Sequence, residues 1–112
     1  MDIQLREEKE ISIIDVEGKI TMSDGCEKFR EAVDSLLAHD KKKILVNLSK
    51  MEYIDSTGVG EMVSSLKTVE NLGGQLKLVS LNNQAYSTFQ LALLLPKFDV
   101  SKDEFEALGK FR

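Results

Sequence analysis

The feature that most constrains the fold of this 112-residue chain is a short run of hydroxyl side chains and glycines that joins two different apolar patterns. Residues 55–60 read Asp-Ser-Thr-Gly-Val-Gly. Before them, residues 43–48 are almost entirely apolar, and after them apolar residues recur at helical spacing as far as residue 72. The pattern predicts a buried strand that passes directly into a helix.

The start of this predicted helix, at residues 57–72, combines capping residues with glycines. Asp55, Ser56 and Thr57 are of the types that cap helix N-termini. Gly58 and Gly60 are costly in a first turn unless something must approach the backbone closely. A helix N-terminus also offers unpaired N–H groups and partial positive charge, which suit an anion such as a phosphate. Simple capping and a phosphate-bearing site both fit these residues.

Familiar motifs for phosphate binding and nucleophilic catalysis do not fit this turn. A P-loop requires a lysine at a set distance after its glycines, and none stands there. A Rossmann turn requires a third glycine where this chain has Val63, and a nucleophile elbow requires one where it has Ile54. The single histidine, His39, falls at the far end of another predicted helix. One histidine and one cysteine, Cys26, cannot supply a structural zinc site. We therefore expect no enzymatic activity, metal or cofactor.

Composition limits the class of protein and its partners. The chain is 42% hydrophobic and 30% charged, which suits one globular domain over residues 1–112. A net charge of −4 disfavours direct nucleic-acid or membrane partners. No apolar run reaches the length of a membrane span, the N-terminus is too charged for a signal peptide, and a lone cysteine cannot form a disulfide within the chain. We expect a cytoplasmic protein.

The other segments alternate between strand and helix patterns. Two strands joined by a polar turn, the second ending near Gly18, predict a hairpin. A helix follows from about Asp24, with Glu27 as its capping-box partner. A strand is expected at 75–81, followed by a helix that Asn82 caps, with Leu93 on its inner face and Pro96 just after it. The last expected elements are a short strand at Phe98 and Val100 and a helix at 103–110 with Phe105 and Leu108 inward.

This order predicts an α/β fold: a mostly parallel central sheet, an antiparallel strand from the N-terminal hairpin, and about four helices. In such sheets, sites form beyond the carboxyl ends of the strands. Residues 55–60 and the loop at 18–24 should therefore meet at one edge.

Three segments together resemble the STAS domain: residues 44–48, residues 53–60, and residues 71–76 with the sequence Asn-Leu-Gly-Gly-Gln-Leu. The resemblance is narrower to the stand-alone bacterial anti-sigma factor antagonists and covers almost the whole chain. It implies a single STAS-like domain in which the serine after the motif aspartate accepts a phosphate. By position that serine is Ser56, with Asp55, Thr57, Gly58 and Gly60 as its supporting residues.

The resemblance also implies a cycle of partners. The unphosphorylated antagonist sequesters an anti-sigma factor that is a serine kinase, and so frees a sigma factor for transcription. Phosphorylation of the serine breaks this complex, and a serine phosphatase resets it. The residues expected to contact the partner are Lys19, Thr21, Met22, Ser23, Asp55, Ser56, Val59 and Met62.

One departure from the family leaves the partner open. Relatives often read Gly-Glu-Leu-Asp after the second strand, where this chain has Gly-Lys-Ile-Thr at residues 18–21. Lys19 could meet an acidic partner, stabilise a phosphate on Ser56, or remain solvated. Two other functions stay open: a subunit of a transporter or stress-signalling complex in which Ser56 only caps the helix, and a weak nucleotide-binding protein.

Overall fold

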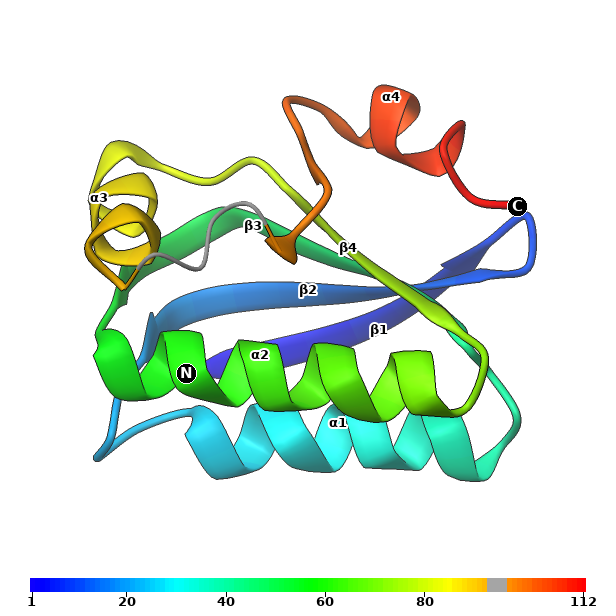
Figure 1. Cartoon of the computed structure of the whole chain (residues 1–112), viewed down its shortest axis with the longest axis horizontal. Helices are drawn as coiled ribbons and strands as arrows, with labels where there is room; N and C mark the ends of the chain where they lie inside the picture. Colours follow the sequence, from blue (N-terminus) through cyan, green and yellow to red (C-terminus); the bar gives the residue numbers. More distant parts are fainter. Residues whose placement is uncertain (93–96) are drawn as a thin grey trace.

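The computed structural model describes residues 1–92 and 97–112. Within these ranges, five strands form one mixed sheet in the order β1–β2–β3–β4–β5 (Figure 1). Their bounds are Asp2–Glu8 (β1), Ile11–Ile20 (β2), Lys43–Ile54 (β3), Gln75–Val79 (β4) and Val100–Ser101 (β5). β1 and β2 are antiparallel, and each later neighbour is parallel. The predicted mostly parallel sheet with an N-terminal antiparallel hairpin is confirmed.

The described part of the chain contains four helices: Cys26–Ala38 (α1), Ser56–Asn71 (α2), Asn83–Leu91 (α3) and Glu104–Leu108 (α4). The first three connect successive strands, and α4 follows β5. α1 and α2 lie side by side on one face of the sheet, and α4 lies on the opposite side (Figure 1). α3 lies at the edge of the sheet where α2 begins. No described helix is long and apolar enough to cross a membrane.

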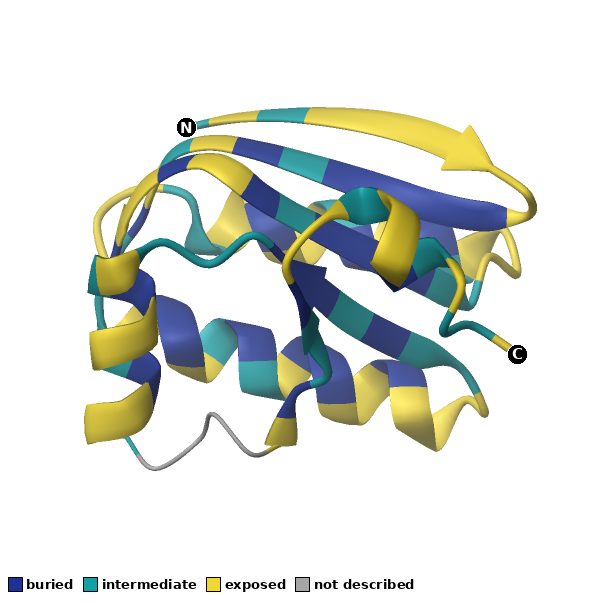
Figure 2. Ribbon diagram, turned by 90° about the horizontal axis from the view of Figure 1, so that it is seen from above, coloured by how far each residue is buried: buried dark blue, intermediate teal, exposed yellow. Residues whose placement is uncertain are grey.

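Side chains that alternate along the central strands build a core on each face of the sheet. The larger core joins the sheet to α1, α2 and α3 and includes Phe29, Ile44, Val46, Leu48, Met62 and Phe89. The smaller core, under α4, consists of Ile11, Ile13, Leu45, Val79 and Ala107. Burial on both faces explains the apolar runs in the first halves of β2 and β3. Figure 2 shows these two strands largely buried while β1 is exposed.

The start of α1 differs from the prediction. The helix begins at Cys26, and its N-cap is Gly25, which has a φ of +95° and no side-chain cap. A Cβ at this position would lie 2.5 Å from the Lys19 carbonyl oxygen, so only glycine fits. Asp24 instead closes a tight turn, in which the Thr21 amide donates to its carbonyl oxygen at 2.6 Å. The predicted capping box from Asp24 to Glu27 is therefore wrong.

The C-terminal helix also differs in the face that it buries. Phe105 was predicted to point inward, but its side chain is 89% exposed, whereas Ala107 is fully buried. Two residues along a helix correspond to a rotation of about 200°, so a helix that packs Ala107 on the sheet must turn Phe105 outward. Leu108 packs against the smaller core as predicted.

Strand lengths were predicted less well than strand identities. β2 and β3 run to Ile20 and Ile54, beyond the predicted ends near Gly18 and residue 48, and β4 stops at Val79. Phe98 precedes β5 and packs edge-on against Phe89, with ring centroids 5.4 Å apart. Leu93 and Pro96 lie outside the described residues.

An ion-pair network on the α4 side joins the hairpin to the last helix. The Arg6 guanidinium donates to both carboxylate oxygens of Asp15, at 2.5 and 2.9 Å, and to Glu104 at 2.6 Å. Asn47 donates to the same Asp15 carboxylate at 2.8 Å. The hydrogen bonds from Arg6 lower the pKa of the Asp15 carboxyl, outweighing its partial burial.

This network predicts a specific loss of stability in acid. Because the folded pKa of Asp15 lies below its unfolded value of about 3.9, the network stabilises the fold above about pH 4, and that stabilisation is lost as the pH falls through the folded pKa. Asp15→Asn should lower the free energy of unfolding at pH 7 by roughly 1 kcal/mol, since the pair is partly exposed. It should also make the unfolding free energy depend less on pH between about pH 5 and 2.

Urea denaturation across this pH range measures both effects. Asp34→Asn, at an exposed position on α1, is the matched control and should keep the wild-type slope. Equal slopes for wild type and Asp15→Asn would contradict the assignment.

Candidate functional site

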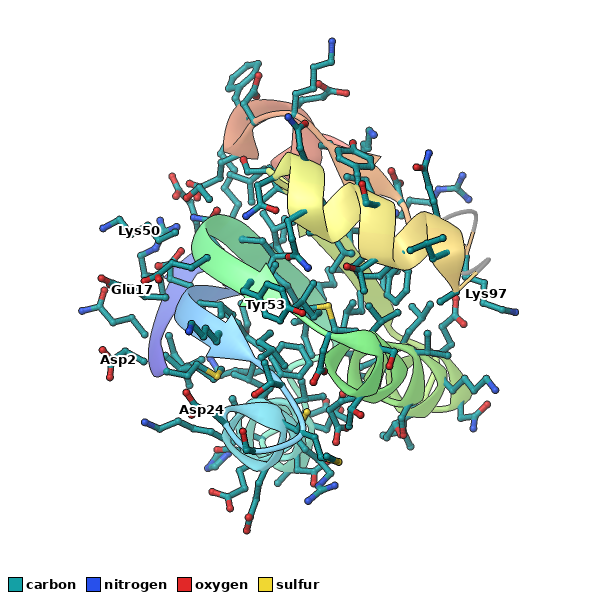
Figure 3. All side chains as sticks on the ribbon, turned by 90° about the vertical axis from the view of Figure 1, so that its left-hand side faces the viewer. Asp2, Glu17, Asp24, Lys50, Tyr53 and Lys97 are labelled. Atoms are coloured by element: carbon teal, nitrogen blue, oxygen red, sulfur yellow. The ribbon has the colours of Figure 1, made fainter. Side chains whose placement is uncertain are left out.

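The two segments singled out in the sequence meet where β2 and β3 end. Ile20 and Ile54, the last residues of these parallel strands, are register partners. The Asp55 amide then donates to the Ile20 carbonyl oxygen at 3.2 Å. Figure 3 looks onto this edge, with Tyr53 between α3 and the turn that contains Asp24. The prediction that residues 55–60 share an edge with the loop after the second strand is confirmed.

The Asp55 carboxylate holds the two segments together. Its Oδ1 accepts from the Gly58 amide at 2.8 Å and so caps α2. The helix begins at Ser56, one residue earlier than predicted, and its cap is Asp55 and not Ser56. Its Oδ2 accepts from the Met22 amide at 3.1 Å, a contact that sequence reasoning did not find. The Asp55 carboxylate therefore orients both the helix start and the neighbouring loop. Separately, Arg30 of α1 donates to Glu61 of α2 at 3.2 Å and joins the two helices near their N-terminal ends.

Ser56 and Thr57 are the first two residues of α2, and both are exposed. The backbone N–H groups at the first positions of a helix have no acceptor within the helix, and they point outward from its N-terminal end. The helix dipole is positive at that end. A negative group carried by the Ser56 hydroxyl would lie beside these amides. The geometry thus fits an accessible serine that can carry an anion.

The two glycines of the motif have different structural roles. A Cβ at residue 58 would lie 2.3 Å from the Ile20 carbonyl oxygen and 2.7 Å from the Ile54 side chain. Gly58 is therefore required by the close approach of α2 to the ends of β2 and β3, as the sequence pattern indicated. A Cβ at Gly60 would meet no atom of the described residues within 4 Å, so packing against that part of the chain does not explain this glycine.

Two residues predicted to contact a partner are in the core instead. The side chains of Val59 and Met62 are completely buried between α2 and the sheet. They lie on the inner face of the helix, whose apolar spacing they share with Leu66 and Val69. As folded they offer no surface to a partner, and the prediction for these two residues is corrected.

The remaining predicted contacts lie on the surface around Asp55. Lys19, Met22 and Ser23 are exposed, Met22 by 78%, while Thr21 is half-buried. The structure also places Tyr53 at this edge, where it is the register partner of Lys19 and 43% exposed; the sequence analysis did not single it out. A large aromatic residue just before the motif, at the end of a buried strand, was the signal that could have indicated it.

The described residues contain no arrangement for catalysis next to Ser56. His39 is the C-cap of α1, at the opposite end of the helix layer (Figure 1), and its Nδ1 contacts the Ser35 carbonyl oxygen at 2.8 Å. Cys26 is half-buried, and burial raises the pKa of its thiol above the usual range. Within residues 1–92 and 97–112, no cluster of three or more histidine, cysteine or acidic side chains could hold a metal.

Comparison with known proteins identifies the family. The STAS domain family matches residues 2–107. The anti-sigma-B factor antagonist of Bacillus subtilis (strain 168) is 34% identical over 65 residues, which cover 58% of this chain and 60% of that protein. A crystal structure from Thermotoga maritima, assigned to the anti-sigma factor antagonists, superposes with a TM-score of 0.89 at 25% identity and covers 98% of this chain and 94% of that one. The Bacillus cell fate determinant SpoIIAA in its phosphorylated form superposes with a TM-score of 0.74 at 22% identity and covers 99% and 100%.

The chain belongs to the STAS domain family. The relatives named above are among the family's anti-sigma factor antagonists, which confirms the resemblance seen in the motif. The anti-sigma factor antagonists that this chain resembles are non-enzymatic STAS proteins.

The two glycines predict opposite effects of alanine. Gly58→Ala forces a methyl group against backbone and should destabilise the fold by roughly 1–3 kcal/mol. Gly60→Ala meets open space and should stabilise the helix by about 0.5–1 kcal/mol. Each variant is the other's control in thermal and urea unfolding. If both variants changed stability equally, the close approach at Gly58 would not be the reason for that glycine.

Proposed function

We propose that this protein is a cytoplasmic anti-sigma factor antagonist, and that phosphorylation of Ser56 switches off its binding to an anti-sigma factor serine kinase. One observation carries the proposal. The exposed Ser56 hydroxyl stands at the start of α2 directly after Asp55, and Asp55 also holds the exposed loop that contains Met22. The phosphoacceptor and the binding surface are thus one structural unit.

The partner surface in this proposal consists of Lys19, Thr21, Met22, Ser23, Asp55 and Ser56. Met22 offers an exposed apolar side chain at its centre, and Lys19 offers a positive charge. A partner that covers this edge frees its sigma factor by exclusion. No DNA contact by this chain is required.

Ser56 suits the role of phosphate acceptor better than that of nucleophilic catalyst, because no base lies beside it in the described residues. The kinase supplies ATP, magnesium and the base. The Ser56 oxygen forms a bond to the terminal phosphorus of ATP, ADP leaves with the electrons of the broken bond, and the hydroxyl proton passes to the kinase base. A serine phosphatase reverses the modification by hydrolysis.

Phosphorylation should affect the interface much more than the fold. It adds about −1.5 to −2 charge at neutral pH, which the helix dipole and the first-turn amides can accommodate. A partner packed on the same edge would have to desolvate that charge. A hundredfold loss of affinity corresponds to only about 2.7 kcal/mol, so exclusion of this kind is sufficient for a switch.

Ser56 is expected to be the phosphoacceptor. Incubation with the anti-sigma factor serine kinase of the same genome and ATP, followed by peptide mass spectrometry, should place the phosphate on Ser56. Ser56→Ala should abolish the modification while keeping the fold and partner binding, and Thr57→Ala, the matched control, should still be modified. Calorimetry should then show at least about a hundredfold weaker kinase binding for the phosphorylated protein.

Phosphate on Thr57 would overturn the residue assignment. Equal affinity of the two forms would overturn the switch, and failure of any such kinase to bind the unmodified protein would favour the role of a subunit in another complex.

Lys19 is expected to contribute an electrostatic contact that sets this chain apart from relatives with acidic residues at that position. Lys19→Glu should weaken kinase binding by roughly three- to tenfold at low salt, mainly through the association rate, and the difference should shrink as salt rises from about 20 to 300 mM. Lys67→Glu makes the same charge change at an exposed position on α2, about three turns beyond Ser56. It should have little effect. Identical affinities for wild type and Lys19→Glu at every salt concentration would assign Lys19 to the solvent.

A further inference from the structure

Among the residues that the structure describes, the second half of β3, which leads into the turn at residues 55–60, has a strand neighbour on only one of its two edges. β3 pairs with β2 as far as Ile54. Its pairing with β4, however, runs only from Lys43 to Asn47, because β4 ends at Val79 and the chain then enters α3. The second half of β3 thus extends past the end of β4 toward the turn at residues 55–60.

Two side-chain amides from the start of α3 take the place of that missing strand. Asn82 donates from Nδ2 to the Met51 carbonyl oxygen at 2.9 Å. Gln84 makes two bonds to one residue: the Ile54 amide donates to its Oε1 at 3.0 Å, and its Nε2 donates to the Ile54 carbonyl oxygen at 2.7 Å. The Gln84 carboxamide therefore satisfies both backbone polar groups of Ile54, as a paired strand would.

Gln84 is itself held in place. Its Nε2 also donates to the Thr88 hydroxyl at 2.9 Å, and that hydroxyl donates to the Gln84 carbonyl oxygen at 3.0 Å. Gln84 and Thr88 are both half-buried. Partial shielding from water strengthens such bonds and makes their loss costly. The carboxamide is thus oriented before any partner arrives.

Ile54 is the last fixed point before the switch residues. The next residue, Asp55, bonds through its amide to the Ile20 carbonyl oxygen and through its carboxylate to the Gly58 and Met22 amides. Any rotation of the Ile54 peptide would move Asp55 and change the direction of Ser56. The backbone orientation at Ile54 therefore controls both halves of the candidate site.

We propose that Gln84 is a positioning residue: its carboxamide locks the Ile54 backbone and so sets the placement of Asp55, Ser56 and the Met22 loop. Its effect on phosphorylation rests on the proposed function above, whereas its effect on the geometry of the turn does not. α3, which carries none of the expected contact residues, thereby becomes part of the site.

Gln84→Met tests the proposal, because it keeps the length and helix propensity of the side chain but removes both bonds. Gln84→Glu keeps the acceptor for the Ile54 amide but sets a carboxylate against the Ile54 carbonyl oxygen. Gln90→Met, on an exposed position of the same helix, is the matched control. Amide hydrogen exchange of the intact protein, measured by NMR, reports on the Ile54, Gly58 and Met22 amides, and the Val33 and Leu78 amides report global opening.

Both Gln84 variants should speed exchange at Ile54, Gly58 and Met22 by at least about tenfold relative to the global reporters, while Gln90→Met leaves the ratio unchanged. Unchanged exchange at these three amides, or an equal increase at every amide, would overturn the positioning role.

In the kinase assay, Gln84→Met should lower the maximal rate of Ser56 phosphorylation more than it raises KM. If Gln84→Met were phosphorylated at the wild-type rate although its turn amides exchanged faster, Gln84 would set the geometry of the turn only. The proposed effect on phosphorylation would then be overturned. If the kinase modifies not even the wild type, the proposed function fails, and the exchange data still decide the role of Gln84.

Discussion

The close approach of α2 to the ends of two parallel strands is the constraint on which the site depends. The first turn of the helix packs against the Ile20 carbonyl oxygen so tightly that no side chain fits at Gly58. Because the helix is this close, one carboxylate, that of Asp55, can cap the helix and also bind the Met22 amide. A larger residue at position 58 would push the helix away and separate the two halves of the site.

The motif contains both residues that build the site and residues that present it. Asp55 and Gly58 make the internal contacts, and Val59 is buried, whereas Ser56 and Thr57 face solvent. The exposed pair lies beside first-turn amides whose partial positive charge favours an anion. A domain of this design can gain or lose a phosphate at its surface without repacking its core. The change is then felt by whatever covers the edge, which is the property that a binding switch requires.

The support for this edge comes from three directions. β2 holds Asp55 through the bond from the Asp55 amide to the Ile20 carbonyl oxygen, and the loop after β2 holds Asp55 through Met22. α3 holds Ile54 through the carboxamide of Gln84. Farther from the edge, the Arg6 network fastens α4 to the hairpin on the other face. The site is thus bonded to β2 and α3, although its functional residues lie at a strand end, in a loop and in the first turn of a helix.

The local pattern of the sequence determined the elements, their order and the place of the motif. Apolar runs, helical spacing and capping residues are short-range signals, so the strand–turn–helix at Ser56 and the Asn82 cap of α3 could be predicted. The choice of Asp55 over Ser56 as the cap of α2 could not. The same signals misplaced the start of α1 and the inward face of α4, because those depend on how closely a neighbouring strand or sheet approaches.

Only the tertiary structure decided which motif residues are accessible and what holds the turn. Val59 and Met62 belong to the core, and Tyr53 lies at the surface, a distinction that spacing along the chain did not reveal. The bonds from Asp55 to Met22 and from Gln84 to Ile54 join residues 33 and 30 positions apart. Contacts of this kind leave no periodic trace in a sequence, because they exist only once parallel strands have brought distant segments to the same edge.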